Sequence, residues 1–516
     1  MMVADNSLYN ECCMSLGTLL ADYCDVPLPH EALVVTGISL DSREVKPGDL
    51  FFACHGSQHS GQNYIQQAIK YGASAILYEE PYSLPESVRP VPHIPIHDLK
   101  EKLGLIADRF YGSPSRPLNV IGVTGTNGKS SCSHFIAHTL SKGCPTPCGL
   151  MGTLGNGVYG NLNASLNTTP DAVSVHRLLH EIGDKGAKDL VMEVSSHGLQ
   201  QGRVNSVKFN TAVFTNLTHE HLDYHGSMEA YLEAKLRLFK EFNIESAVVN
   251  MADPSAKQIL ACLDKNVSVV GYRLDELDPV KREEVVASTI RMIEAVPIKS
   301  SAFGIAAKIS SPWGKGVLRS NLLGRFNVEN LLATLGVLLL NGVSLDEALA
   351  RLETVRALTG RMEPFQRQKG ELLVVVDYAH TPDALSQALS ALRSASRGSL
   401  WCVFGCGGDR DKEKRSKMGE IAESLSDNLI ITNDNPRYED PQKIIGDVTS
   451  RLHAEITVIQ DRAMAIKFAI ENAAANDIVL IAGKGHETYQ ELGGNRTYFS
   501  DRDEVIKNLG IRMDLP

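Results

Sequence analysis

The sequence lacks the features that mark membrane, secreted and nucleic-acid-binding proteins. No apolar run in its 516 residues approaches the roughly 18–20 residues that a membrane-spanning helix needs. Residues 1–13 have neither the basic start nor the apolar core of a signal peptide. Lys and Arg total 51 against 61 Asp and Glu, a net charge of −10, which argues against binding to bulk nucleic acid or to a membrane surface. We therefore expect a cytoplasmic protein, with room for a local basic pocket that binds a small anion.

The ten cysteines form no metal-binding or disulfide pattern. Cys144 and Cys148, like Cys402 and Cys406, are separated by three residues, whereas paired zinc or redox cysteines are usually separated by two. They are therefore interpreted as small buried hydrophobes in a reducing compartment. Internal repeats, low-complexity tracts and blocks of like charge are also missing. A hydrophobic content of 43% and a length of 516 residues predict two to four globular domains.

Short apolar runs alternate with turns or helices along most of the chain. This alternation predicts an α/β fold whose parallel sheets have helices on both faces. Residues 111–117 (YGSPSRP) are typical of a linker, and 355–364 is interpreted as the next boundary. Residues 266–320 are less regular and are expected to be an appended antiparallel segment. The predicted strands are 34–39, 50–54, 75–78, 119–123, 190–194, 212–215, 247–250, 372–377, 400–405, 428–432, 455–460 and 477–483, and the first domain also has a predicted helix at 64–71.

A glycine-rich loop follows the predicted strand 119–123. Gly125 and Gly128 precede Lys129 and two serines, and an amphipathic helix is expected to start there. A strand, a glycine loop and a helix in this order cradle phosphates on backbone N–H groups, while the lysine adds charge and the first serine can bind Mg²⁺. Val123 stands where the standard loop has its first glycine. The alternative is an ordinary glycine-rich turn, which the Gly-Lys-Ser sequence disfavours.

Two further polar groups follow predicted strands of the central region. Glu193 ends an apolar strand, so it is either a second ligand of the same Mg²⁺ or a cap for the next helix. Residues 216–226 gather His219, His221, Asp223 and His225. A zinc site is one interpretation, but no matching Cys/His set occurs at a recognised spacing. We favour one histidine as the ligand of a hard cation.

Lys235 lies on the apolar stripe of a predicted helix at 227–242. A lysine that points inward is costly unless paired, and desolvation favours its neutral amine, which can take up CO₂ to become a carbamate. The alternative is a lysine whose head reaches out to water. Periodicity alone favours this second interpretation.

The last third of the chain carries four more polar motifs after strands or at turns. Asp377 and His380 stand in DYAHTPD, and Arg410 follows three residues of a glycine turn. DNPR, 434–437, could by itself be a surface Asx-Pro turn. In AGKGHETYQ, 482–490, two glycines bracket a lysine ahead of Glu487.

The order of these motifs resembles the Mur ligase family over nearly the whole chain. The motifs concerned are LDSREVKPGDLFFA, TGTNGKS, EVSSH, NLTHEHLDYHG, YLEAK, GRFNVEN, GRME, DYAHTPD, GCGGDRDK, DNPR and AGKGHETYQ. TGTNGKS is similar to the family's own phosphate loop, which accounts for Val123. The resemblance implies three domains. These are an N-terminal UDP-substrate-binding domain at 1–115, a central Mur-type ATP-binding domain at 116–356 with a P-loop ATPase-type parallel sheet, and a Rossmann-like amino-acid-binding domain at 357–516.

The resemblance also implies the reaction and its substrates. ATP phosphorylates a carboxylate of a UDP-N-acetylmuramoyl dipeptide, and the amine of meso-diaminopimelate attacks the acyl phosphate during peptidoglycan precursor synthesis. Such phosphoryl transfer depends on positioning and charge neutralisation. The expected protein is a monomer that works on small molecules with Mg²⁺. YLEAK resembles the family's modified-lysine motif, so the resemblance favours N6-carboxylysine, a CO₂-derived carbamate, at Lys235.

Matching positions assign the site residues by resemblance. ATP is expected at Gly125, Thr126, Asn127, Gly128, Lys129, Ser130, Ser131, Asn327 and Arg361, with Asp377 and His380 as further catalytic or nucleotide contacts. The metal ligands are Ser130 and Glu193, with His221 and modified Lys235 for a second ion. The UDP substrate is expected at Leu40, Ser42, Ser57, Gln58, His59, Asn167, Thr168, Thr169, Ser195, Gln201 and Arg203. Diaminopimelate is expected at Arg410, Asp434, Asn435, Pro436, Arg437, Gly483 and Glu487.

Two positions bear on the choice among related functions. Arg437 offers a planar bidentate donor for the extra carboxylate that distinguishes diaminopimelate from lysine, which disfavours a lysine-adding Mur ligase. Gly202 stands where many members carry a bulkier residue, which puts the stiffness of the loop before Arg203 in doubt. A folylpolyglutamate-synthase-like ligase would not need DNPR. A non-catalytic scaffold should have lost Lys129, Lys235 or His380, and all three are present.

Overall fold

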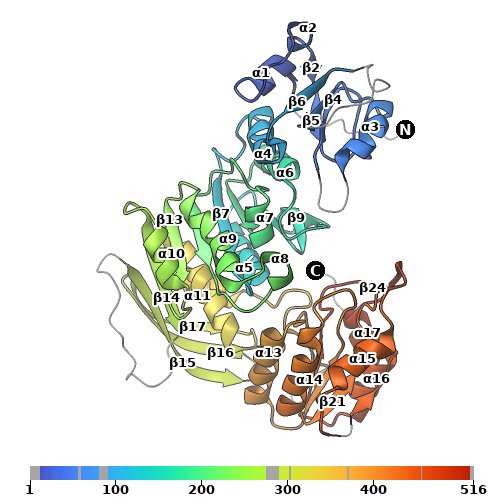
Figure 1. Cartoon of the computed structure of the whole chain (residues 1–516). Coiled ribbons are helices and arrows are strands. Elements are labelled where there is room, and N and C mark those ends of the chain that lie inside the picture. Colours follow the sequence, from blue (N-terminus) through green and yellow to red (C-terminus); the bar gives the residue numbers. More distant parts are fainter. Residues whose placement is uncertain are drawn as a thin grey trace, which may run out of the picture. The chain divides into compact units, whose positions relative to one another are not determined.

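The computed structural model describes residues 12–55, 60–80, 91–274, 290–301, 304–368, 371–454 and 456–511, and it has the predicted α/β class (Figure 1). Contacts between residues divide the chain into two units. The first comprises Met1–Gly122, Cys144–Thr211 and Arg237–Ile244, and the second Val123–Gly143, Ala212–Leu236 and Glu245–Pro516. This division passes through one strand, β7 (Asn119–Thr124), so the boundaries of the three predicted domains stay a prediction.

A four-stranded parallel sheet forms one core of the first unit. Its strands are β3 (Gly37–Ser39), β4 (Asp49–Ala53), β5 (Ala75–Glu79) and β6 (His93–Ile96). Leu50 and Leu77 pack on one face with Leu16 and Ile106, while Phe51 and other alternate residues pack on the opposite face. Both faces are covered, which explains the nearly continuous apolar sequence of β4. The flanking elements are β1 (Met14–Ser15), α1 (Leu16–Leu20), α2 (Leu28–Glu31), β2 (Val34–Val35), η1 (Gly61–Tyr64), α3 (Ile65–Lys70) and α4 (Leu99–Phe110).

The rest of the first unit is built around β11 (Asp189–Glu193). The strand order is β10-β9-β8-β11-β7, in which β8 runs parallel to β11 and β9 is antiparallel to both β8 and β10. Glu193 and Ser195 therefore stand at the carboxyl end of a parallel strand, where open α/β sheets place ligands. The other elements are β8 (Gly149–Gly152), β9 (Gly155–Val158), β10 (Asn161–Asn163), α6 (Ala172–Asp184) and α7 (Ser196–Gln200).

In the second unit, neighbouring strands follow the order β12-β13-β14-β15-β16-β17. The prediction that 266–320 is an antiparallel segment is wrong in its first part, because β14 pairs parallel with both β13 and β15. Helix α10 lies between β13 and β14 in the chain and provides the crossover that a parallel pair needs. In the described part of 266–320, β16 pairs antiparallel with β15 and with β17. The bounds are β12 (Thr211–Phe214), β13 (Ser246–Asn250), α10 (Ala256–Cys262), β14 (Ser268–Leu274), β15 (Arg291–Ser301), β16 (Gly304–Ser311) and β17 (Gly314–Ser320).

Helix α5 (Lys129–Ser141) follows the glycine loop as predicted, but it is not amphipathic. Cys132, Phe135 and Ile136 are buried, and so are Ser133 and Thr139, whose hydroxyl donates to Phe135 O at 2.7 Å. The helix packs against α11, so almost none of its surface is left for solvent. The remaining helices of this part are α8 (Leu222–His225), α9 (Met228–Lys240), α11 (Arg325–Leu340) and α12 (Leu345–Glu353).

The last part of the second unit is a sheet in the order β18-β19-β23-β20-β21-β22, parallel except for β18. Helices α13 (Pro382–Ala395), α14 (Glu413–Leu425) and α15 (Pro441–Thr449) pack on the face that carries Val375, Cys402 and Leu480. Helices α16 (Arg462–Asn472) and α17 (Asp501–Leu509) cover the opposite face (Figure 1). The strands are β18 (Glu363–Phe365), β19 (Leu373–Asp377), β20 (Leu400–Phe404), β21 (Asn428–Ile431), β22 (Thr457–Val458) and β23 (Ile478–Ala482), followed by the hairpin β24 (Tyr489–Leu492) and β25 (Asn495–Tyr498).

No helix in the described part of the chain is both long enough and apolar enough to cross a membrane.

Candidate functional site

The glycine loop joins β7 to α5 as the sequence predicts. Lys129 begins α5, and its Nζ donates to the carbonyl oxygens of Gly125 at 2.9 Å and Thr126 at 2.8 Å. The backbone N–H of Asn127 donates to Oδ1 of Asn216 at 2.9 Å, and the Asn127 side chain donates to Asp383 Oδ2 at 3.1 Å. The loop is therefore held by side chains from outside the strand and helix that it connects.

Lys235 is buried beneath this loop, with an exposed fraction of 2%. Its Nζ donates to Gly125 O at 2.8 Å and lies 4.4 Å from the centre of the Tyr231 ring. The interpretation that its head reaches out to water is therefore wrong. Burial, and next the charge of Lys129, hold the pKa of Lys235 well below its ordinary value. A buried neutral amine is the form that reacts with CO₂.

Glu220 is a candidate that the sequence reasoning missed. Its carboxylate lies 3.5 Å from His380 Nε2 and 3.7 Å from His221 Nε2. His380 is 160 residues from Glu220 in the sequence, so folding brings the two together. Burial acts to raise the pKa of Glu220, but the hydrogen bond and charge of His380, with His221 and Lys129, hold it below its ordinary value. The signal in the sequence was a carboxylate between two imidazoles in His-Glu-His.

Asn327, Asp377 and Arg361, which are predicted nucleotide contacts, are held by contacts within the second unit, and Asn327 is buried. Asn327 donates from Nδ2 to Leu323 O at 2.7 Å and accepts from Asn330 at 3.2 Å. Asp377 accepts from the N–H groups of Met362 at 2.7 Å and Ala379 at 2.8 Å, and burial raises its pKa. Asp377, at the end of β19, therefore holds the GRME turn, residues 360–363, in place. Arg361, in that turn, stacks over the ring of Tyr378 at 4.4 Å.

Glu193 is almost fully buried at the end of β11, with an exposed fraction of 1%. Its Oε1 accepts from Thr153 N at 2.8 Å and its Oε2 accepts from Thr153 Oγ1 at 3.3 Å. Thr153 Oγ1 also lies 3.0 Å from Thr168 Oγ1. The interpretation of Glu193 as a helix cap is wrong, because Ser195 caps α7 through Gly198 N. Carboxylate oxygens are among the ligands that a hard cation prefers.

Four residues predicted for the UDP substrate lie together in the first unit. Thr169 Oγ1 donates to Glu193 O at 2.8 Å and accepts from Ser195 N at 3.0 Å. Arg203 Nη1 donates to Thr169 O at 2.8 Å, while its Nε and Nη2 contact Gln201 Oε1 at 3.0 and 2.7 Å. The structure thus joins segments 167–171 and 195–203 into one polar surface at the end of β11.

Other members of that predicted set are placed less centrally or not at all. Ser42 is buried and donates to Gln67 Oε1 at 2.9 Å, while Leu40 packs against the core of the four-stranded sheet. Asn167 is exposed. Ser57, Gln58 and His59 lie outside the described residues.

Most of the predicted amino-acid site gathers at the ends of β21 and β23. Asn435 donates from Nδ2 to Glu487 Oε2 at 2.9 Å, and Arg437 Nη1 donates to Gly408 O at 2.6 Å. A Cβ on Gly483 would lie 2.9 Å from Asp434 Oδ2, so these two positions are adjacent. Pro436 is buried and Arg410 is exposed beside this group.

Lys484 is a second residue that the sequence reasoning left out of the site. It is fully buried, and its Nζ donates to Asn435 Oδ1 at 3.1 Å and Glu487 Oε2 at 3.0 Å. The glycines on both sides of it were the available signal. Lys484 holds the Glu487 carboxylate in place and compensates its charge.

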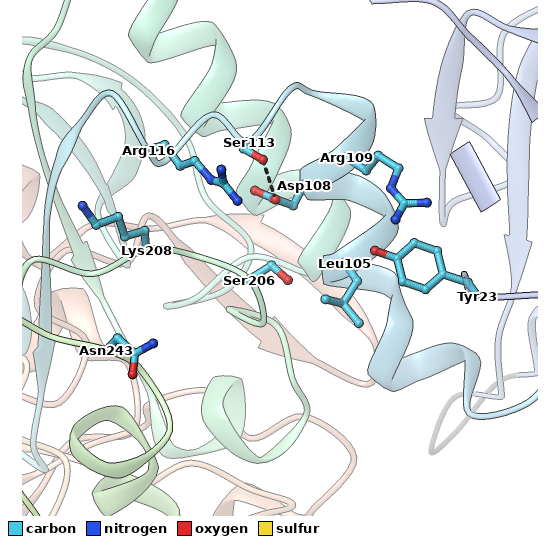
Figure 2. Close-up of a pocket in the computed structure, with 9 residues that line it drawn as sticks. All are labelled: Tyr23, Leu105, Asp108, Arg109, Ser113, Arg116, Ser206, Lys208 and Asn243. Atoms are coloured by element: carbon cyan, nitrogen blue, oxygen red, sulfur yellow. Dashed lines mark hydrogen bonds between the residues drawn. The ribbon is translucent and has the colours of Figure 1, made fainter. Parts of the chain in front are cut away.

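A polar cavity of about 770 Å³ lies elsewhere in the first unit (Figure 2). Its Arg109 contacts the carbonyl groups that end α1, and Ser113 donates to Asp108 at 2.9 Å. No predicted site residue lines this cavity, so the volume of a cavity does not by itself identify the candidate active site. The lining residues are Tyr23, Leu105, Asp108, Arg109, Ser113, Arg116, Ser206, Lys208 and Asn243.

Within the described ranges, no group of three or more His, Cys, Asp and Glu side chains is arranged to hold a metal ion. Mg²⁺ binds through one or two protein ligands with water and phosphate oxygens. The hydroxyl of Ser130 and the carboxylate of Glu193 are oxygen donors that suit it.

Comparison with known proteins covers nearly the whole chain. Family models match as Mur ligase family, catalytic domain, at 34–111; Mur ligase middle domain at 123–338; and Mur ligase, glutamate ligase domain, at 360–485.

Individual relatives match over almost their full length. The UDP-N-acetylmuramoyl-L-alanyl-D-glutamate--2,6-diaminopimelate ligase of Coxiella burnetii is 44% identical over 92% of this chain and 96% of its own. The enzyme of the same name from Chromobacterium violaceum is 44% identical over 94% and 96%. A solved structure of that name has a TM-score of 0.68 at 36% identity over 96% of this chain and 99% of its own. The chain therefore belongs to the Mur ligase family.

Proposed function

We propose that this protein joins meso-diaminopimelate to UDP-N-acetylmuramoyl-L-alanyl-D-glutamate in an ATP-dependent reaction of peptidoglycan precursor synthesis. The observation that carries the proposal is 44% identity over 92% of the chain to a relative named for this ligation. DNPR and its contacts to the residues around Glu487 are consistent with that substrate. The protein is proposed to act as a cytoplasmic monomer on these small molecules.

The proposed reaction has two steps. A substrate carboxylate oxygen attacks the γ-phosphorus of ATP, and the bond from that phosphorus to the β–γ bridging oxygen breaks, releasing ADP. The amine of diaminopimelate then attacks the acyl carbon, a C–N bond forms, phosphate leaves and the nitrogen loses a proton. Lys129 and the loop N–H groups would bind the phosphates in place, since phosphoryl transfer is catalysed by positioning and charge neutralisation.

Mg²⁺ would neutralise phosphate charge when bound, with Ser130 and Glu193 as its ligands and His221 and modified Lys235 supporting a second ion. The chemistry of the donors fits, because hydroxyl and carboxylate oxygens are the ligands that Mg²⁺ prefers. The neutral Lys235 amine would attack CO₂ to form an N–C bond and release one proton, which turns a buried neutral amine into an anion. Glu220 would hold His380 in orientation beside the loop.

Arg437 is proposed to select the incoming amino acid. Its guanidinium matches the second carboxylate of diaminopimelate, which lysine lacks. An unpaired cation would penalise lysine by roughly 10²-fold or more in kcat/KM. Glu487, held by Lys484 and Asn435, would accept from the distal ammonium group.

The test is direct. The protein is incubated with ATP, Mg²⁺ and the UDP-muramoyl dipeptide, diaminopimelate or lysine is added, and phosphate release and product mass are followed. We expect turnover with diaminopimelate and little with lysine. Turnover with lysine alone would favour the lysine-adding alternative, and turnover on a folate substrate would favour the folylpolyglutamate alternative. No turnover with diaminopimelate and intact dipeptide would contradict the proposal.

The same assay tests Arg437. Arg437→Ala should relax discrimination against lysine by roughly 10-fold or more, because the guanidinium that lysine leaves without a carboxylate partner is removed. Arg496→Ala, at an exposed arginine of the adjacent hairpin, is the control. Unchanged selectivity in Arg437→Ala would mean that the selective cation lies elsewhere.

A further inference from the structure

Arg415 is a cation buried at an unfavourable place in the fold. It is the third residue of α14, and its side chain is fully buried. The amino end of a helix carries partial positive charge, so a guanidinium there is destabilised both by desolvation and by the helix dipole. A buried cation persists at such a position only where acceptors compensate its charge.

Three acceptor groups surround this guanidinium. Nη1 donates to Glu439 Oε2 at 3.0 Å and to Asp447 Oδ2 at 2.8 Å. Nη2 donates to Glu439 Oε1 at 2.9 Å and to Gly407 O at 3.2 Å. Arg415 therefore grips Glu439 with both nitrogens, which fixes the orientation of that carboxylate.

Glu439 in turn bridges two loops, the glycine loop 405–412 and the DNPR turn 434–437. Its Oε1 also accepts from the backbone N–H of Asp409 at 2.6 Å. Tyr438 N donates to Asp409 Oδ2 at 3.1 Å. The carboxylate thus ties the loop that carries Arg410 to the segment directly after Arg437.

The two loops are in contact at their backbones. Gly408 N donates to Asn435 O at 2.9 Å, and Arg437 Nη1 donates back to Gly408 O at 2.6 Å. A Cβ on Gly408 would lie 1.9 Å from Pro436 O, so no other residue fits there without separating the loops. A small change in how Glu439 is held would be transmitted to both loops.

We propose that Arg415 is a positioning residue for amino-acid selection, which acts through Glu439 to fix the spacing between the loop of Arg410 and the turn of Arg437. This rests on the proposed function. Carboxylate recognition by guanidinium groups needs placement within about 0.5 Å. The pair of Arg415 and Glu439 thus acts as a clamp on the two loops. Loosening this clamp weakens binding of the second carboxylate of diaminopimelate, and it affects lysine less because lysine has no second carboxylate.

The test uses Glu439→Gln, which keeps an acceptor but removes the charge, and Arg415→Lys, which keeps the charge but loses the two-nitrogen grip. Arg393→Lys is the control, since Arg393 lies on α13, away from both loops, and pairs with Asp427. We expect either test variant to raise KM for diaminopimelate about 10-fold and to lower the diaminopimelate-to-lysine ratio of kcat/KM by a similar factor. KM for ATP should stay unchanged.

This ratio separates positioning from a merely structural effect. Partial unfolding lowers kcat for both amino acids equally and leaves the ratio unchanged. If the wild-type enzyme is active on diaminopimelate and both variants keep its diaminopimelate-to-lysine ratio of kcat/KM, the positioning role alone is overturned. Absence of wild-type activity on diaminopimelate would instead overturn the proposed function.

Amide hydrogen exchange tests the clamp without any substrate. In the full-length protein, the N–H groups of Gly408, Asp409 and Tyr438 are bonded between the loops and should exchange slowly. Their exchange should become faster in Glu439→Gln and stay the same in Arg393→Lys. Equal exchange of these amides in wild type and Glu439→Gln would overturn the clamp.

Discussion

Lys235 lies in surroundings that fit poorly with an ordinary lysine. Its ammonium would be buried within reach of Lys129 and a carbonyl oxygen. We expect Lys235→Ala to lower kcat by about 10²-fold or more, because the carbamate would carry charge stabilisation at the phosphates. Added formate or acetate should restore part of the activity by supplying the missing carboxylate. Steady-state phosphate release measures both effects.

Lys240→Ala is the matched control, since Lys240 is an exposed lysine on the same helix. It should keep wild-type activity and gain nothing from added carboxylate. Full activity of Lys235→Ala without any carboxylate would refute the carbamate.

Single residues were predictable from sequence where they follow a strand and carry a reactive group. The structure places Lys129 at the helix start after β7, and Glu193 and Asp377 at strand ends, while their roles stay a prediction. Glu220 and Lys484 were not predicted, because their importance comes from partners that only folding supplies. Glu220 meets His380 across 160 residues of chain, and Lys484 meets Asn435 across 49. Such pairings leave no periodic pattern in the sequence.

At the scale of elements, the end of α7 decides how Arg203 is presented. Gly202 has a φ of 66°, and it donates to Leu199 O at 3.2 Å while Arg203 N donates to Gly198 O at 2.9 Å. These two bonds are those of a Schellman C-cap, in which glycine is the preferred residue. The glycine therefore gives the turn a defined geometry, which answers the doubt that its sequence raised.

Gly202→Ala should lower stability by about 1 kcal/mol, since a left-handed backbone is costly for residues with a Cβ. It should also raise KM for the UDP substrate. Gly183→Ala is the control, because Gly183 lies inside α6, where no φ above zero is required and a Cβ finds only Leu118 at 3.9 Å. Thermal unfolding and substrate titration measure the two effects. A Gly202→Ala variant as stable as Gly183→Ala would contradict the C-cap argument.

Strands were predicted more reliably than their pairing. Buried runs such as 372–377 and 477–483 agree with β19 and β23 to within a residue, because a strand covered on both faces has a continuous apolar sequence. The direction of β14 was missed, since direction depends on the crossover and not on the strand's own residues. Of the predicted run 455–460, residue 455 lies outside the described residues, and Thr457–Val458 form the two-residue strand β22 at the edge of its sheet.

At the scale of the whole molecule, the order of motifs was more informative than any one of them. The glycine loop alone indicates phosphate binding, and DNPR alone is compatible with a surface turn. Their shared order with the family, which three family models match from 34 to 485, converts separate weak signals into one fold and one class of reaction. Long-range contacts then decide which of the predicted residues lie together.

Stability against acid is a property of the whole molecule that one histidine should influence. Burial, and next the charges of Arg361, His380 and Lys484, lower the pKa of His486 to about 4 from its ordinary 6.5. Between these values the unfolded chain binds a proton that the folded chain does not, so stability falls as the pH drops from 6.5 to 4. At about 1.4 kcal/mol for each pH unit, the loss is of the order of 3 kcal/mol.

Replacing this histidine should therefore flatten the acid limb of the stability profile. His486→Gln should have an unfolding midpoint in urea that changes less between pH 7 and about pH 4.5 than that of the wild type, because glutamine takes up no proton. His453→Gln, at an exposed histidine of the same sheet region, should keep the wild-type pH profile. Parallel profiles for His486→Gln and wild type would show that the acid sensitivity comes from other groups. A profile that is flattened only in His486→Gln would locate it beside Tyr378, whose ring centre lies 5.0 Å from that of His486.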